Sequence, residues 1–371
     1  MRRIPIQNMY YILCYAWGMG EMRGKVNMEV EKCPSLADLL VHILLNATDN
    51  LLRRGMAQGY TVYGSDMDGI KGKIDIGETL KLGRFRQGRM YCNYDELNSD
   101  ILINQIIIST LMDAAKIKSL SCENKDRIAK TLRRMPQTRR IRITNKTLSS
   151  VKLHRNNRYY HFALNVCKLL HQSLLPNECI AGKQVFLDIQ DDERLMNRIF
   201  EKFLMNFYKQ ECKQDFPEVS RSHIRFQLTP YGMTFAKSTD EAYALLPVME
   251  TDVTLFNPQT QKKIILDAKY YKNTLVSRYG EKEKIRRDHL SQILTYVMNQ
   301  ENDVQPHTKD TRGILVYPTV DTELDVSYAY RNTSHIIRIS TVNLNQDWRM
   351  IEQRLKEIIC NQESRDGSLI R

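Results

Sequence analysis

The segment from Thr251 to Tyr271, which reads TDVTLFNPQTQKKIILDAKYY, constrains the fold of this chain more than any other stretch. It predicts two β-strands joined by a turn, because β-branched, aromatic and aliphatic residues lie on both sides of a strand-breaking Asn-Pro dipeptide. In an antiparallel hairpin of this length, Asp252 lies opposite Leu266 or Asp267. Since cross-strand neighbours have Cβ atoms about 4.5–5.5 Å apart, two carboxylates can meet across the hairpin.

A lysine joins these carboxylates. Strand side chains alternate between faces, so Asp267 and Lys269 share one face, and Asp252 can complete a cluster there. Paired carboxylates repel each other unless a cation lies between them, and Mg²⁺ suits an all-oxygen site. The cluster therefore predicts metal-assisted phosphodiester hydrolysis. The alternative is an exposed hairpin with solvated charges, but the apolar triplet Ile264–Leu266 favours a buried strand.

Charge and composition restrict the partners. The chain has 371 residues, with 55 Lys and Arg against 43 Asp and Glu, and the net charge of +12 favours a polyanionic partner. The eight cysteines form no CxxC pair and the histidines no HExxH motif, so neither a zinc site nor a disulfide framework is predicted. No apolar run is long enough to span a bilayer, so we expect a cytoplasmic protein without a membrane partner.

Residues 1–182 are expected to form an α+β domain. Apolar residues recur at helical spacing over 6–17, and a longer helix is predicted from the N-cap Ser35 to Gly55. Short glycine-punctuated strands over 59–94 predict a small sheet, with another helix starting near residue 99 or 100. We place the boundary to the second domain between Pro176 and Asp188.

Three basic segments of this first domain are candidate contacts. The segment 81–90 is a basic loop that could meet phosphate or an acidic partner, and two further clusters mix cations with aromatic side chains or prolines. A solvated surface is the alternative for each. Their members are Arg84, Arg86 and Arg89; Arg133, Arg134, Arg139, Arg140 and Arg142; and His154, Arg155, Arg158, Tyr159 and Tyr160.

Residues 183–371 are expected to form an α/β domain with a mixed central sheet flanked by helices. A two-wide apolar stripe predicts a helix over 193–210, and weaker strands follow near 223–228 and 232–236. The hairpin is followed by a charged loop. The remaining predicted elements are a helix over 287–300, strands over 313–318 and 335–341, and a closing helix over 348–359.

The order of these elements and residues resembles the PD-(D/E)xK nuclease superfamily. Asp252 stands where the Asp of the Pro-Asp pair falls, with Thr in place of Pro, and Asp267 and Lys269 match the D-x-K tripeptide. Gln292 and Tyr296 match the Q-x-x-x-Y element of RecB-like members. Because they are four residues apart on a predicted helix, both can point towards the hairpin.

Most of the chain more specifically resembles the McrC family, the nuclease subunits of McrBC modification-dependent restriction systems. The similar segments include IPIQNMYYILCYAW, GKIDI, CNYDELNSDILINQII and FEKF. The resemblance implies a C-terminal domain that cleaves DNA with Mg²⁺, as a type IV restriction-like endonuclease. It also implies an N-terminal domain that docks on a hexameric AAA+ GTPase, McrB. That partner recognises 5-methylcytosine and uses GTP, which this chain does not bind.

The resemblance assigns roles to individual residues. Asp252 and Asp267 would be Mg²⁺ ligands, Lys269 would act on the attacking water or the scissile phosphate, and Gln292 and Tyr296 would support the site. The superfamily often adds a glutamate from the helix before the hairpin, and Glu201 stands at that place. On a helical wheel Glu201 lies away from the centre of the apolar stripe, so a plain solvated glutamate is the alternative.

Two other functions stay open at this point. One is a PD-(D/E)xK nuclease that acts in DNA repair or another defence context without a GTPase. The other is a non-catalytic DNA-binding adaptor subunit, which would leave Asp252 and Asp267 far apart in the structure.

Overall fold

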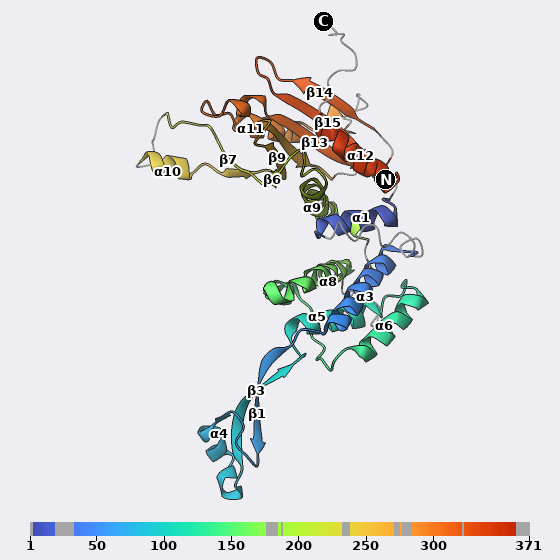
Figure 1. Ribbon diagram of the computed structural model, residues 1–371, viewed down its shortest axis with the longest axis vertical. Coiled ribbons are helices and arrows are strands. Elements are labelled where there is room, and N and C mark those ends of the chain that lie inside the picture. The colour runs from blue at the N-terminus through green and yellow to red at the C-terminus, as the bar shows by residue number, and fades with distance from the viewer. Residues whose placement is uncertain are drawn as a thin grey trace. The chain divides into compact units, whose positions relative to one another are not determined.

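The computed structural model shows two compact units (Figure 1), each described by itself below. One unit combines Met1–Lys32 with Ile189–Arg371, and the other is Cys33–Asp188. The structure describes residues 3–18, 33–175, 185–186, 188–231, 238–270, 275–276, 284–320 and 323–360.

The first helix of the chain belongs to the same compact unit as residues 189–371, whereas the sequence-based division at residue 182 placed it in the first domain. Helix α1 (Ile6–Ala16) packs beside α9 (Glu193–Glu211) in the unit that contains the hairpin. The Tyr15 hydroxyl donates to Glu211 Oε1 at 2.6 Å, and Asn206 Nδ2 donates to the Tyr15 carbonyl at 2.8 Å. An apolar stripe predicts that a helix is buried but does not identify the element that buries it, so the sequence placed α1 with its chain neighbours.

The unit Cys33–Asp188 combines helices with a three-stranded antiparallel sheet of order β1-β3-β2. Ser35 caps α3 by accepting from the Asp38 amide, and the helix ends at Gly55, as predicted. The elements are α3 (Leu36–Arg54), β1 (Gly59–Met67), β2 (Lys73–Ile74), α4 (Ile76–Lys81), β3 (Met90–Asn98), α5 (Leu102–Ala114), α6 (Cys122–Arg134), α7 (Asn145–Ser149), α8 (His161–Ser173), β4 (Leu174–Leu175) and β5 (Val185–Phe186).

The other unit is built on a mixed six-stranded sheet of order β14-β15-β13-β10-β9-β6, which confirms the predicted α/β architecture. Strands β10, β13 and β15 are parallel, and the other neighbours are antiparallel. Its further elements are β6 (Glu218–Ser220), β7 (His223–Arg225), α10 (Thr239–Ala244), β8 (Val248–Glu250), β9 (Val253–Asn257), β10 (Lys262–Ala268), β11 (Leu275–Val276), β12 (Lys284–Ile285), α11 (Arg287–Met298), β13 (Arg312–Thr319), β14 (Asp325–Ala329), β15 (Ile336–Asn343) and α12 (Trp348–Ile359).

The two weaker strand predictions, over 223–228 and 232–236, have different outcomes. The strand expected over 223–228 is shortened to β7, which pairs with β8 outside the large sheet. The strand expected over 232–236 lies outside the described residues. Strand β6 was not predicted, because a three-residue edge strand leaves too few positions for a period to show.

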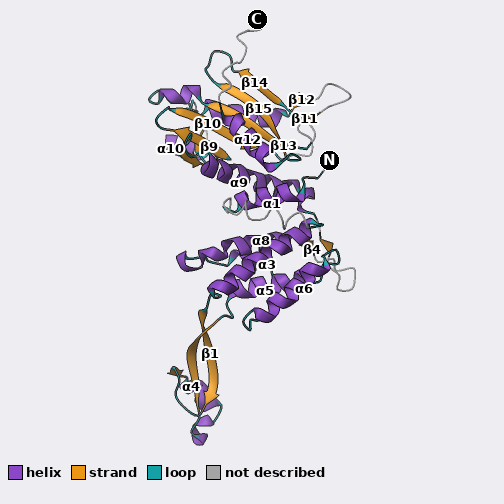
Figure 2. Ribbon diagram, turned by 45° about the vertical axis from the view of Figure 1, so that its right-hand side comes forward, coloured by secondary structure: helices purple, strands orange, loops and turns teal. Residues whose placement is uncertain are grey.

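Helices cover both faces of the sheet (Figure 2). Helix α11 packs on the face that carries Ile265, Leu315 and Ile339. Helix α12 lies on the opposite face, where Arg338 donates to the carbonyl of Ile358 at 2.8 Å. A Cβ atom added at Gly313 would come within 2.7 Å of Ile293 Cγ1, so the absence of a side chain there lets α11 approach the sheet closely.

No helix in the described ranges is both long enough and apolar enough to cross a membrane.

Candidate active site

The two strands of the hairpin bring Asp252 and Asp267 together. Strands β9 and β10 pair with Val253 opposite Leu266, so the next residues along the same register are Asp252 and Asp267. The backbone amide of Ala268 donates to Asp252 Oδ2 at 2.8 Å, which fixes this carboxylate beside the end of β10. Of the two registers that the sequence left open, the structure has the one that places the carboxylates opposite each other.

Lys269 connects this carboxylate pair to α11. Its Nζ lies 2.8 Å from Asp267 Oδ2 and donates to Gln292 Oε1 at 2.8 Å. Gln292 Nε2 in turn donates to the Tyr296 hydroxyl at 2.7 Å, and that hydroxyl donates to the Glu250 carbonyl at 3.0 Å. The helical spacing of Gln292 and Tyr296 therefore directs both side chains to the hairpin, as expected.

Glu201 also lies at this site rather than in solvent, since its side chain is only 17% exposed. Asn197 donates to Glu201 Oε1 at 2.6 Å, and Arg221 donates to Oε2 at 3.3 Å. Asn197 additionally accepts from the Tyr270 amide at 2.8 Å, so one turn of α9 holds both the glutamate and the end of the hairpin. Burial, together with the charge of Asp252, raises the pKa of Glu201.

Sequence reasoning missed Arg221. This arginine follows β6 directly and reaches both Glu201 and Glu250, the latter at 3.7 Å. Among the described residues, Lys269 forms an ion pair with Asp267, and Arg221 is the further cation that pairs with carboxylates of this site, those of Glu201 and Glu250. No motif in the sequence marks it, because its place depends on an edge strand too short to predict.

Burial dominates the electrostatics of the carboxylates. It raises the pKa of Asp267, Lys269 partly offsets the rise, and the charge of Asp252 adds to it. Burial raises the pKa of Asp252 as well, although the Ala268 amide and Lys269 act in the opposite direction. The ionised forms of both groups are therefore penalised, and a bound cation would relieve the penalty.

The donor set fits a hard divalent cation. Asp252 and Asp267 supply two carboxylates, and Mg²⁺ is usually held by one or two carboxylates together with water and substrate phosphate. Within the described ranges, no three His, Cys, Asp or Glu side chains are arranged as a metal-ligand group. A site that completes its shell with water and phosphate oxygens is consistent with both observations.

Three arginines of the second basic cluster form ion pairs with carboxylates of the same unit. Arg134 pairs with Asp49 at 2.7 Å, Arg140 pairs with Asp113 at 2.6 Å, and Arg139 pairs with Asp100. The ion pairs weaken the interpretation of this cluster as a DNA contact, because a paired arginine must give up its carboxylate to bind phosphate.

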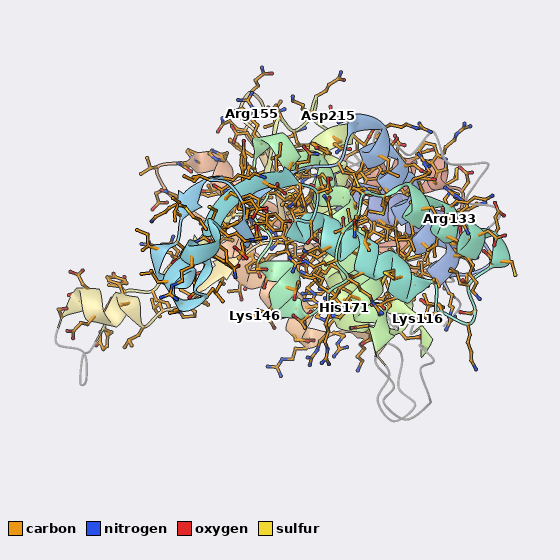
Figure 3. The ribbon with its side chains drawn as sticks, turned by 90° about the horizontal axis from the view of Figure 1, so that it is seen from below. Lys116, Arg133, Lys146, Arg155, His171 and Asp215 are labelled. Carbon is orange, nitrogen blue, oxygen red and sulfur yellow. The ribbon has the colours of Figure 1, made fainter. Side chains whose placement is uncertain are left out.

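Of the two tyrosines in the third cluster, Tyr159 is exposed and Tyr160 has a structural role. Tyr160 is fully buried, and its hydroxyl donates to Asn104 Oδ1. Arg133 and Arg155 remain exposed among the outward side chains in Figure 3. The side chains of Arg84 and Arg158 lie outside the described part of the structure.

The family model for the McrBC 5-methylcytosine restriction system component matches residues 7–318 of this chain. The chain belongs to the McrBC family. This match spans both units and includes the hairpin with its carboxylates. The McrBC-family chain is therefore a component of a restriction system of this type, which agrees with the resemblance seen in the sequence.

Two known proteins are similar to this chain, one in sequence and one in fold. The McrBC-family chain is 31% identical over 355 residues to the type IV methyl-directed restriction enzyme EcoKMcrBC of Escherichia coli strain K12, covering 96% of this chain and 97% of that protein. A solved structure of Thermococcus gammatolerans McrB AAA+ hexamers with bound McrC, a half-complex of a tetradecameric assembly, shares its fold. That match has a TM-score of 0.53 at 15% identity and covers 96% of this chain and 76% of the other.

Proposed function

We propose that this chain is the DNA-cleaving subunit of a GTP-dependent restriction system directed at 5-methylcytosine, which hydrolyses phosphodiester bonds of double-stranded DNA with Mg²⁺ in the cytoplasm. The observation that carries the proposal is the meeting of Asp252, Asp267 and Lys269 at the end of one buried hairpin. Membership of the McrBC family supplies the setting of a restriction system.

Each side chain has a role in this proposal. Asp252 and Asp267 would hold Mg²⁺, which when bound polarises a phosphoryl oxygen and favours ionisation of a water. The ammonium of Lys269 faces the same site and offsets negative charge that develops on the phosphate in the transition state. Gln292 fixes that ammonium by accepting its hydrogen bond, and Tyr296 fixes the Gln292 amide.

The structure favours this function over an adaptor without catalytic activity. An adaptor gives no reason for two mostly buried carboxylates to lie opposite each other, since the burial of like charges is costly. A nuclease that acts without a GTPase keeps the same chemistry. Family membership favours the restriction system over that context.

The proposal is tested with Asp267→Asn, which removes one negative charge and keeps the size of the side chain. The full-length chain is mixed with its GTPase partner, and cleavage of methylated duplex DNA and GTP hydrolysis are measured together. We expect cleavage to fall by at least about a thousandfold, because a ligand of the metal is lost, while GTP hydrolysis persists. Asp240→Asn, at an exposed position of α10, is the matched control. Undiminished cleavage by Asp267→Asn would refute the proposal.

The partner contact is proposed for the small sheet of the other unit. Tyr60 lies opposite Leu97 in the β1–β3 pair, and Val62 is on the same face. These three side chains are 77%, 53% and 69% exposed. An apolar face left open in this way is typical of a surface that another protein covers, and the solved Thermococcus gammatolerans McrC is bound to AAA+ hexamers.

This contact is tested by Val62→Asp, which puts a charge on the exposed face without altering a buried residue. We expect stimulation of GTP hydrolysis by the chain to fall at least about tenfold, because a desolvated charge opposes association. Met350→Asp is a suitable control, since Met350 is 52% exposed on α12 in the unit that carries the hairpin. Equal stimulation by the Val62→Asp variant and the wild type would exclude this face as the contact.

A further inference from the structure

A pocket of about 970 Å³ lies at the opposite end of the sheet from the carboxylate pair. Strands β10, β13 and β15 run parallel, and the pocket lies where they begin, whereas Asp267 is near the end of β10. Lys262 is the first residue of β10, so it is separated from Asp267 by about 16 Å along the strand. The pocket is therefore distinct from the proposed active site.

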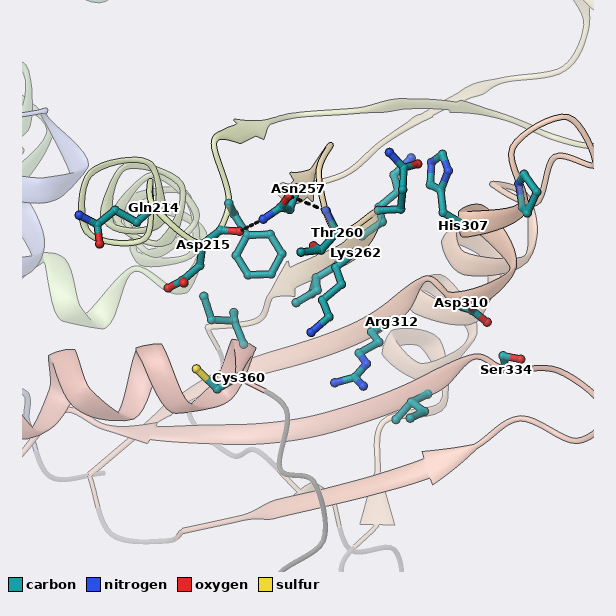
Figure 4. Close-up of a pocket in the computed structure, with 17 residues that line it drawn as sticks. Gln214, Asp215, Asn257, Thr260, Lys262, His307, Asp310, Arg312, Ser334 and Cys360 are labelled. Atoms are coloured by element: carbon teal, nitrogen blue, oxygen red, sulfur yellow. Dashed lines mark hydrogen bonds between the residues drawn. The ribbon is translucent and has the colours of Figure 1, made fainter.

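Positive side chains from two strands point into this pocket. Arg312, the first residue of β13, pairs in register with Ile264, and Lys262 lies two residues before Ile264 on the same face. Lys262 and Arg312 are thus diagonal neighbours. Figure 4 shows both side chains extending into the same space, with the carboxylates of Asp215 and Asp310 towards opposite ends of the pocket.

These cations are not neutralised. Within the described part of the chain, no carboxylate forms an ion pair with Lys262 or Arg312, nor with the neighbouring Lys263. Burial lowers the pKa of Lys263, and burial together with the charge of Arg338 lowers that of Arg312. The carboxylate of Asp325 is already paired with Arg338 at 2.7 Å. A guanidinium stays charged in proteins, so partial burial of Arg312 without an anion is unfavourable.

We infer that this pocket is a second anion-binding site, which takes a phosphate group from a nucleotide or from a DNA strand. A guanidinium can donate two parallel hydrogen bonds to a phosphate, and a lysine adds a point charge. The volume exceeds what a single phosphate needs and falls in the range of ligand pockets, so the sugar or a second phosphate also fits. The ring of His307, which packs at 5.2 Å from that of Phe256, gives the pocket an aromatic wall.

The test uses the full-length chain in EDTA, so that neither metal binding nor cleavage contributes. Inorganic pyrophosphate, GDP and a short duplex oligonucleotide are titrated separately by calorimetry. We expect pyrophosphate to bind the wild type, and Arg312→Gln to weaken binding about tenfold or more, because a charge-assisted hydrogen bond is lost. Arg194→Gln removes the same charge from an exposed position in the first turn of α9, and binding should be unchanged.

The source of the phosphate is read from the other two probes. If the duplex competes with pyrophosphate for the wild type but not for Arg312→Gln, the phosphate comes from a DNA strand. If only GDP competes with pyrophosphate, the phosphate comes from a nucleotide. Lys262→Gln changes an exposed side chain and keeps the test decisive if Arg312→Gln does not fold. The inference is wrong if no probe binds the wild type, or if both variants bind pyrophosphate as tightly as the wild type does. Because cleavage is not measured, failure here leaves the proposed nuclease function untouched.

Discussion

Lys269 Nζ lies 2.8 Å from Asp267 Oδ2, and both side chains are largely withdrawn from solvent, with 13% and 2% of their surface exposed. Lys269 follows β10 directly, and its amide donates to the Val316 carbonyl at 3.0 Å, so the alternation of the strand continues and directs both side chains to one face. The ammonium is thus fixed beside the carboxylate before any ligand arrives. A site fixed in this way does not have to reorganise its charges during the reaction.

The first prediction concerns the residue that orients this ammonium. Gln292→Leu keeps the volume of the side chain but removes the acceptor for Lys269, which then has greater rotational freedom. We expect kcat for DNA cleavage to fall by about tenfold to a hundredfold with little change in KM, since the contact positions a charge rather than binding DNA. Single-turnover cleavage with saturating DNA measures this step.

Thr295→Ala is the matched control for that variant. Thr295 is on the same helix, but its hydroxyl donates to the Ser291 carbonyl on the exposed side. Its cleavage rate should equal that of the wild type. An unchanged kcat in the Gln292→Leu variant would show that the hydrogen bond from Lys269 to Gln292 is not needed to orient the ammonium.

The second prediction concerns the glutamate of α9. If Glu201 contributes charge to cation binding, Glu201→Gln should raise the Mg²⁺ concentration needed for half-maximal cleavage by about threefold to tenfold. The hydrogen bond from Asn197 is preserved, because a Gln oxygen still accepts it. Glu218→Gln, at an exposed position of β6, should leave the Mg²⁺ requirement unchanged. If both variants have the same Mg²⁺ dependence, Glu201 has a structural role and does not contribute to cation binding.

The third prediction concerns stability against acid. Arg338, Arg354 and Ser340 all donate to Asp325, and although burial acts in the opposite direction, these bonds lower the pKa of Asp325 to about 2. Because the folded-state pKa is below the ordinary value of 3.8, this stabilisation is complete above about pH 5 and is lost as the pH falls through 2.

Asp325→Asn tests this prediction. A fall in the pKa of Asp325 from 3.8 to about 2 corresponds to roughly 2 kcal/mol, so the wild type should lose about that much more free energy of unfolding between about pH 5 and pH 2 than the variant does. Urea unfolding at pH 7, 4, 3 and 2 measures the difference. At pH 7 the variant should be less stable by about 2–4 kcal/mol, because Arg338 is then left partly buried without its carboxylate. Parallel pH curves for the two proteins would contradict the expected pKa.

The sequence by itself determined the local features of the site. The apolar triplet before Asp267 predicted a buried strand, strand alternation placed Asp267 with Lys269, and helical spacing placed Gln292 with Tyr296. These relations hold within one element or one hairpin, where geometry follows from a fixed period. The caps of α3 at Ser35 and Gly55 could be predicted for the same reason.

Only the tertiary structure decided what comes together across elements. It brought Glu201 from α9 and Arg221 from the end of β6 to the hairpin, and it moved α1 to the unit that contains the hairpin. It also gathered Lys262 and Arg312, which are far apart in the chain, at the common edge of parallel strands. An apolar stripe or an isolated charge indicates that a side chain makes a contact, but the element that it contacts is set by strand order and helix packing. Those depend on the free energy of the whole core and leave no period in the sequence.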